Sequence, residues 1–199
     1  MEVRDRIIEE ATCLFFKFGI RSVTMDDIAV GIGISKRTVY ENFKDKTELV
    51  YTCMKVLMQK QEQKNQEVMS RSGNVIEILL TSMREGIKAI NSISPLFFHD
   101  LKKYYPEIWK PLHEENQKKN YNQIYTQLRK GINEGLFRKE IHVDIVSKLF
   151  YEQINLISDE TIFPHDEYMF ADVFQSMMIN FIRGISTRKG IDLVDEMLA

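Results

Sequence analysis

The stretch TMDDIAVGIGISKRTVYENF, residues 24–43, decides the fold of this chain because it carries the signals of two short helices joined by a tight turn. Thr24 is followed three residues later by Asp27, a spacing at which a hydroxyl and a carboxylate cap the free N–H groups of a helix start. Gly33 can take the left-handed conformation that ends a helix, and Ser35 is a good cap for the next helix. The stretch therefore predicts a helix-turn-helix, the motif whose second helix enters the DNA major groove.

The second of these helices has an apolar side and a polar side. Val39, Tyr40 and Phe43 recur at helical spacing, so we expect them to point into the core. The polar side begins with two cations and comprises Lys36, Arg37, Thr38, Glu41 and Asn42. Upstream, residues 4–18 have the rhythm of an amphipathic helix, which Gly19 is expected to end. These pieces predict a three-helix unit with one shared core.

The combination closely resembles the N-terminal signature of the TetR family of bacterial repressors. The residues that carry the resemblance are Thr24, Ile28, Ala29, Gly33, Ile34, Ser35, Lys36, Arg37, Thr38, Val39, Tyr40, Phe43 and Lys46. They lie within roughly the first quarter of the chain. Two places depart from the family pattern. Ile32 stands where alanine is common, and Glu41 with Asn42 replaces a frequent aromatic or histidine pair, so the base sequence that is read does not carry over.

The resemblance implies which side chains meet DNA. Lys36, Arg37 and Thr38 are expected in the major groove, with Arg37 or Lys36 reading a guanine edge. Tyr40 and Lys46 are expected on phosphates, and Thr24 can add a phosphate contact at a helix N-terminus. The full predicted DNA-binding set is Thr24, Ser35, Lys36, Arg37, Thr38, Tyr40, Asn42 and Lys46.

Composition agrees with a globular DNA-binding protein. The chain has 199 residues, of which 44% are hydrophobic and 28% charged. Its net charge of −2 argues against a non-specific coat on DNA, whereas a specific binder needs only a basic contact face. Cys13 and Cys53 do not form a disulfide framework, which favours a reducing compartment. Without an apolar leader or a run long enough to span a bilayer, the expected location is the cytoplasm, with no membrane partner.

The remainder of the chain has the pattern of helices, and no stretch alternates at period two for long. A long element is expected from Lys46 to about Val68, followed by helices over 75–93, 95–105, 107–134, 143–160 and 167–186. The sequence therefore predicts an all-α fold. Its expected organisation is a helix-turn-helix DNA-binding domain over residues 1–47 and a larger helical effector-binding and dimerisation domain over residues 48–199.

Aromatic side chains are dense over residues 97–109, and two interpretations are open. The simpler one is ordinary core packing. The other is a cavity in which flat apolar side chains bind a ligand and tyrosine or tryptophan orients it. The resemblance favours the cavity, because such proteins bind small effectors in this domain. No unopposed buried cation is evident, so the predicted effector is apolar or amphipathic. The predicted ligand-binding residues are Met83, Phe97, Phe98, Tyr104, Trp109, Tyr125 and Phe150.

Two apolar stripes in the C-terminal third predict an interface. The stripe over residues 170–185 is wide enough to cover both a neighbour in the chain and a partner chain. The resemblance implies a homodimer formed by two helices from each subunit, which matches a palindromic operator. The predicted interface residues are Val146, Phe150, Val173, Met177 and Phe181.

The sequence gives little support to metal binding or catalysis. The histidines, at positions 99, 113, 142 and 165, include no pair at a helical metal-ligand spacing, and no phosphate loop or nucleophile motif is present. We therefore expect no metal, no cofactor and no enzymatic activity. The leading hypothesis is a ligand-responsive transcriptional regulator, a repressor that binds double-stranded DNA as a homodimer. The alternative is a helical DNA-binding adaptor whose C-terminal domain only dimerises or binds a protein. A helical enzyme would need convergent polar groups in the cavity.

Overall fold

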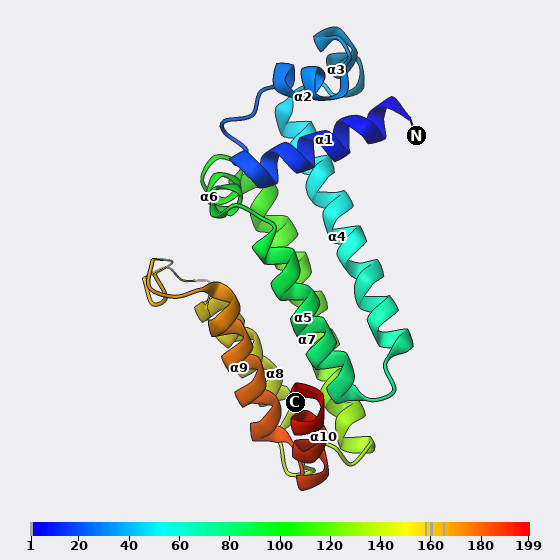
Figure 1. Cartoon of the computed structure of the whole chain (residues 1–199), viewed down its shortest axis with the longest axis vertical. Helices are drawn as coiled ribbons and strands as arrows, with labels where there is room; N and C mark the ends of the chain where they lie inside the picture. The colour runs from blue at the N-terminus through cyan, green and yellow to red at the C-terminus, as the bar shows by residue number, and fades with distance from the viewer. Residues whose placement is uncertain (1, 158, 160, 165) are drawn as a thin grey trace. The chain divides into compact units, whose positions relative to one another are not determined.

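The computed structural model describes residues 2–157, 159, 161–164 and 166–199 (Figure 1). The described residues form ten α-helices: α1 (Val3–Phe18), α2 (Met25–Ile32), α3 (Lys36–Asn42), α4 (Lys46–Arg71), α5 (Val75–Asn91), α6 (Pro95–Tyr104), α7 (Pro106–Asn133), α8 (Val143–Ile157), α9 (Phe170–Ile185) and α10 (Arg188–Leu198). The extended pairing found among these residues is an isolated bridge between Phe137 and Ser186. The predicted all-α fold is confirmed. Residues 158 and 160, at the end of the predicted 143–160 helix, and His165 lie outside the described residues.

Packing divides the chain into two compact units. Unit 1 comprises Met1–Lys64 and Ala89–His113, and unit 2 comprises Asn65–Lys88 and Glu114–Ala199. Unit 1 therefore contains α6 as well as the helix-turn-helix, which the sequence did not indicate. The helices α4, α5 and α7 each contribute residues to both units, because the division falls inside all three.

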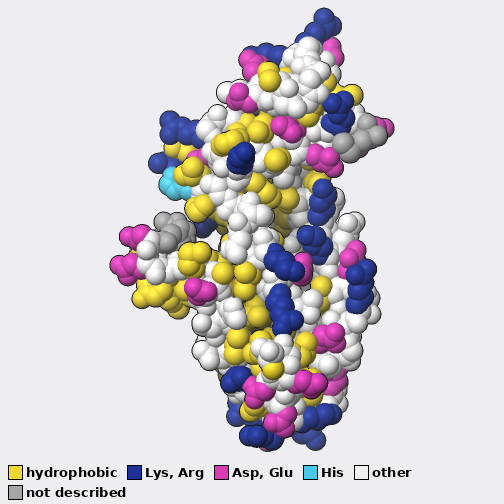
Figure 2. Space-filling view, viewed as in Figure 1, with side chains coloured by type: hydrophobic (Ala, Val, Ile, Leu, Met, Phe, Trp, Pro, Cys, Tyr) yellow, Lys and Arg dark blue, Asp and Glu magenta, His cyan; other side chains and the backbone are white. Residues whose placement is uncertain are grey.

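Charged side chains of both signs are interspersed over the face of the molecule shown in Figure 2, in keeping with a net charge of −2. Among the described helices, none combines the length and the apolar character needed to cross a membrane. The described side chains also include no group of three or more His, Cys, Asp or Glu that could hold a metal ion. One histidine has an aromatic neighbour instead: His113 stacks on Trp109 with ring centroids 4.8 Å apart.

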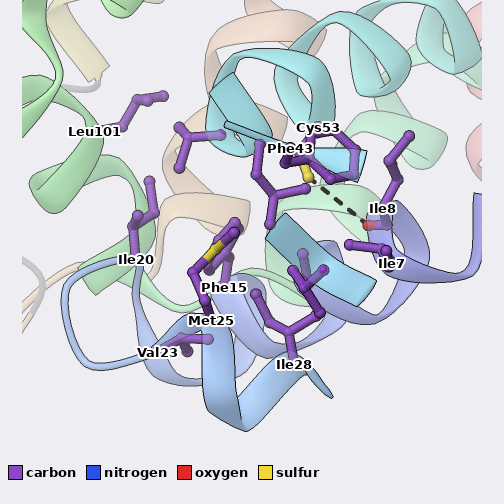
Figure 3. Close-up of a cluster of buried hydrophobic side chains, with 14 of the residues drawn as sticks. Ile7, Ile8, Phe15, Ile20, Val23, Met25, Ile28, Phe43, Cys53 and Leu101 are labelled. Carbon is purple, nitrogen blue, oxygen red and sulfur yellow. Dashed lines mark hydrogen bonds between the residues drawn. The ribbon is translucent and has the colours of Figure 1, made fainter. Parts of the chain in front are cut away.

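The core of unit 1 forms where the apolar faces of short helices meet (Figure 3). Along α1, Ile7, Ala11 and Phe15 lie one turn apart and are each at most 1% exposed, which is the periodicity expected of an amphipathic helix. The other fully or almost fully buried contributors include Ile20, Ile28, Val39, Phe43, Leu49 and Cys53. Burial of each large apolar side chain contributes roughly 1.5–3 kcal/mol relative to exposure. The first helices therefore depend on a shared core more than on helix propensity.

The helix α6 is fixed to α1 and to the loop that follows α1. At its start, the backbone N–H of Ser94 donates to the carbonyl of Phe16 over 2.7 Å. The rings of Phe16 and Phe97 then meet edge to face, with centroids 5.0 Å apart. Further along, Asp100 is only 7% exposed and accepts a hydrogen bond of 2.7 Å from the backbone N–H of Arg21. These contacts explain why α6 belongs to unit 1.

Unit 2 has its own core, built from α5, α7, α9, α10 and the connector that contains Phe137. The helix α10 was not predicted from the sequence. Thr187 begins this helix by accepting a hydrogen bond of 3.2 Å from the N–H of Gly190, and Val194 is fully buried. A Cβ at Gly190 would lie 2.3 Å from the carbonyl oxygen of Leu136, so this close approach of two backbones requires glycine.

The two cysteines are expected to differ in reactivity. Cys13 is exposed, whereas Cys53 is 2% exposed and burial raises the pKa of its thiol to about 11. Because the thiolate is the reactive form, a disulfide reagent at about pH 8 should modify one thiol per folded chain and two in guanidinium chloride. Cys13→Ser should abolish the reaction of the folded chain. Rapid modification of two thiols in the folded wild-type protein would contradict this packing.

Candidate functional site

The helix α2 begins at a capping box formed by Thr24 and Asp27. The Thr24 hydroxyl oxygen accepts from the backbone N–H of Asp27 over 3.2 Å, and the Asp27 carboxylate accepts from the backbone N–H of Thr24 over 2.7 Å. The carboxylate also accepts from the Thr24 hydroxyl over 2.7 Å. These hydrogen bonds, the hydroxyl bond first, hold the pKa of Asp27 below its usual range. The predicted cap is confirmed, and it already uses the Thr24 hydroxyl as both donor and acceptor.

The turn between α2 and α3 is made by Gly33. Its φ of 69° and ψ of 37° lie in the left-handed region, where a residue with a Cβ is disfavoured. The next residue, Ile34, returns its N–H to the carbonyl of Ala29 over 3.0 Å and completes the end of α2. Ser35 then begins α3, because its hydroxyl accepts from the N–H of Thr38 over 3.1 Å. The glycine turn and the serine cap are both confirmed.

The short helix α3 and its C-cap residue, Phe43, bury a single line of side chains. Val39 and Phe43 lie one turn apart and are 0% and 1% exposed. Tyr40 is 46% exposed, so the prediction that it points into the core was wrong. The reason is geometric: successive residues of a helix are about 100° apart, and the buried line that contains Val39 leaves Tyr40 outside. Its ring and hydroxyl are therefore accessible.

The two predicted base readers are exposed, and each is paired with an acid. Lys36 Nζ lies 2.9 Å from a carboxylate oxygen of Asp26, and this hydrogen bond raises the pKa of Lys36. Arg37 Nε lies 2.9 Å from Glu41 Oε1, one turn along α3. Exposed ion pairs contribute little to stability, so a base edge or a phosphate can replace either acid at small cost.

Three other residues of the predicted DNA-binding set form hydrogen bonds within α3 and its N-cap. Asn42 Nδ2 donates to the carbonyl of Thr38 over 2.9 Å. The hydroxyl groups of Thr38 and Ser35 lie 2.9 Å apart and share a hydrogen bond. These contacts shape the helix, and a DNA contact by Ser35, Thr38 or Asn42 stays a prediction.

Lys46, at the start of α4, holds the loop between α1 and α2. Its ammonium donates to the carbonyls of Ile20 and Val23. Burial lowers the pKa of Lys46, and the carboxylates of Asp100 and Asp27 act in the opposite direction. An ammonium has three donors, so one remains for the phosphate contact that the sequence predicts.

The structure does not bring the seven predicted ligand-binding residues together. Met83 and Phe150 line one cavity in unit 2, and Tyr125 lies at a different, polar hollow of the same unit. Unit 1 holds the other four. Phe97, Phe98 and Trp109 pack in its core, and the Tyr104 hydroxyl accepts from the Arg21 guanidinium over 2.8 Å. The aromatic density of residues 97–109 therefore reflects the packing of unit 1.

The cavity of unit 2 has a volume of about 170 Å³. Its apolar lining comes mainly from α5, α7, α8 and α9 and includes Ile78, Leu79, Met83, Ile124, Phe150, Phe174 and Met178. The polar lining residues are Asn65, Ser82, Asn120, Gln123, Gln127 and Tyr151. Sequence reasoning missed most of this set because the residues are spread over five helices and no local motif joins them. The one signal was the apolar face of α5.

The predicted interface helices α8 and α9 pack against each other within the chain. The ring centroids of Phe150 and Phe181 lie 4.5 Å apart. The side chains of Val146, Val173 and Met177 are half-buried. An outer row on α8 is more exposed: Ile145, Leu149 and Leu156 are 50%, 58% and 47% exposed. Their spacing places all three on one face of the helix. This exposed apolar row is the part of α8 that a partner subunit could cover.

Comparison with known proteins agrees with this arrangement. A family model described as bacterial regulatory proteins, tetR family, matches residues 7–51. The HTH-type transcriptional repressor KstR2 of Mycobacterium tuberculosis is 24% identical over 191 residues, which cover 94% of each chain. A solved transcriptional regulator from Cytophaga hutchinsonii has the same fold, with a TM-score of 0.75 and 18% identity over 92% of this chain and 98% of that one. A regulator from Saccharomonospora viridis in complex with choline gives a TM-score of 0.72 and 18% identity over 93% and 98%.

We expect Lys46→Met to lower the stability of the protein. The carbonyls of Ile20 and Val23 would lose their charged donor, and the loss of hydrogen bonds to such a group costs about 1–3 kcal/mol. Lys44→Met is the matched control, because Lys44 is exposed two residues away. Urea unfolding monitored by circular dichroism measures both. Equal midpoints for Lys46→Met and wild type would show that these hydrogen bonds do not hold the loop.

Proposed function

Because this chain belongs to the TetR family of bacterial transcriptional regulators, we propose that it binds a near-palindromic operator as a homodimer and leaves it when a small apolar or amphipathic effector binds. The chain is a DNA-binding transcriptional regulator, and its relative KstR2 is a repressor, which supports repression as the mode of action. The observation that carries the DNA-binding role is the structure of α3. A capped, seven-residue helix keeps Val39 buried and leaves Lys36, Arg37 and Tyr40 exposed together.

The proposed DNA contact of each side chain follows from its chemistry. Arg37 is the proposed reader of a guanine edge, because its planar guanidinium can donate two parallel hydrogen bonds to the O6 and N7 atoms. Tyr40 and the remaining donor of Lys46 are the proposed phosphate contacts, which set position and affinity rather than sequence. Glu41 and Asp26, the present partners of the two cations, would be displaced on binding.

A homodimer provides the two reading heads that a palindrome requires. The row of Ile145, Leu149 and Leu156 supports association through α8, because covering exposed apolar side chains removes unfavourable contact with water. The predicted residues Val146, Phe150, Val173, Met177 and Phe181 would then lie at or behind this contact.

The cavity of unit 2 is the proposed effector site. Its lining is mainly apolar, which supports an apolar or amphipathic effector. Effector binding would act by population shift, favouring a state of the dimer that does not match the operator. The helices α4, α5 and α7 can carry the coupling, because each contributes residues to the unit with the cavity and to the unit with α3.

Selection from random duplex DNA without effector should enrich a near-palindrome with half-sites about one helical turn apart or somewhat more. Tyr40→Ala should weaken binding to all sequences alike, whereas Arg37→Ala should also relax the preference at one position by about 1–3 kcal/mol. Lys118→Ala, an exposed cation on α7 in unit 2, is the control and should leave both unchanged. Failure to enrich any palindrome would contradict the proposal.

Leu149→Asp should convert the dimer to a monomer and abolish operator binding. A carboxylate in an apolar interface loses its hydration and gains no partner. Leu149 is 58% exposed in the single chain, so the substitution should leave the subunit folded. Leu96→Asp, at an equally exposed leucine of α6, should leave the dimer intact. Sedimentation equilibrium measures both, and a dimeric Leu149→Asp variant would place the interface elsewhere.

A further inference from the structure

A residue that lines the cavity of unit 2 has a buried polar atom without a partner. Gln127 is 2% exposed, lines the cavity, and its Oε1 atom is buried without accepting a hydrogen bond. Most buried polar side-chain atoms in folded proteins have a partner, because an unmet acceptor has lost its water and gained nothing. Its neighbours along α7 do not compensate, since Ile124 and Leu128 are buried hydrocarbon side chains. This oxygen could therefore accept a hydrogen bond from a ligand.

No ionised group lines this cavity among the described residues. The lining residues, all within the described part of unit 2, include no lysine, arginine, histidine, aspartate or glutamate. Their polar groups are neutral: amides of asparagine and glutamine, and hydroxyls of Ser82 and Tyr151. An ion placed in such surroundings would lose its hydration without a counter-charge. The cavity therefore favours a neutral occupant.

The volume of the cavity and the shapes of its lining side chains further limit the class of effector that it can bind. A cavity of about 150 Å³ is enough for a benzene molecule, so about 170 Å³ suits a single ring or a short branched chain. The aromatic rings of Phe150 and Phe174 can pack against a ligand of this size. Met83 and Met178 are flexible and can adapt to its outline.

We propose that the effector is a small neutral molecule with an apolar body and a hydroxyl or N–H group, and that the Gln127 amide turns toward the cavity so that Oε1 accepts from this group. This inference rests on the proposed function and names the chemical class that its site takes. A ligand hydroxyl replaces the hydrogen bond of any water held in the empty cavity, whereas a hydrocarbon expels the water and leaves the acceptor unmet. Gln127 thus selects alcohols and phenols over hydrocarbons of the same shape.

The test uses p-cresol and p-xylene, which differ in a hydroxyl against a methyl group of similar size. Calorimetric titration of the full chain gives the dissociation constant of each probe for wild type and for Gln127→Met, which keeps the length of the side chain and removes the acceptor. The variant should bind p-cresol more weakly but not p-xylene, so that the ratio of the two constants shifts by about tenfold toward p-xylene. Gln127→Leu provides the same comparison if the methionine variant does not fold.

Asn122→Met is the matched control. It removes an exposed amide from the same helix, outside the cavity lining, and should leave the ratio unchanged. The substitution at Gln127 should also raise the melting temperature of the ligand-free protein, because it removes a buried atom without a partner.

Two results would overturn the inference. One is an unchanged ratio in both Gln127 variants although the probes bind, which would leave the cavity as an effector site with a different selectivity. The other is the absence of binding by either probe to the wild-type chain. Operator binding, followed in the same preparations by DNA fluorescence anisotropy, separates both results from the proposed regulatory function, which fails if no operator is bound.

Discussion

The loop from Gly19 to Val23 has backbone groups that no helix can pair, and two charged side chains from distant parts of the chain pair them. Lys46 donates to the carbonyls of Ile20 and Val23, and Asp100 accepts from the N–H of Arg21. The loop leads directly into the capping box of α2. Because buried backbone groups need partners, these hydrogen bonds fix where the helix-turn-helix begins with respect to the start of α4 and the middle of α6. The position of α3 within unit 1 depends on them.

The features predicted correctly from sequence are those whose physics is local. The capping box at Thr24, the left-handed turn at Gly33 and the cap at Ser35 each involve residues within about four positions of one another, so spacing alone reveals them. Two other features depend on tertiary contacts. Tyr40 was wrongly expected in the core because the buried line of a short helix is set by the neighbour it packs on. The carbonyl contacts of Lys46 depend on a loop whose path the sequence does not show.

The aromatic residues over 97–109 and the cavity of unit 2 also show the difference between local sequence signals and tertiary contacts. The aromatic cluster was visible as a local density, and in the structure its members Phe97 and Trp109 pack with the N-terminal helices. The cavity was hidden because its residues come from five helices, and Gln127 lies in a helix rich in polar side chains. An unmet acceptor is a property of three-dimensional packing. It becomes evident only when the neighbours that should have satisfied it are known.

A ligand can shift an equilibrium only through an element that responds to its site and also bears on the other function. The helix α7 is the proposed element of this kind. It lines the cavity with Ile124 and Gln127, and its first two turns bury Ile108 and Leu112 in the core of unit 1. Pro111 lies in the part of α7 that belongs to unit 1, where it removes one backbone hydrogen bond of the helix. Under the proposed coupling, a change around Gln127 would reach the core of unit 1 along the continuous helix that joins Gln127 to Leu112.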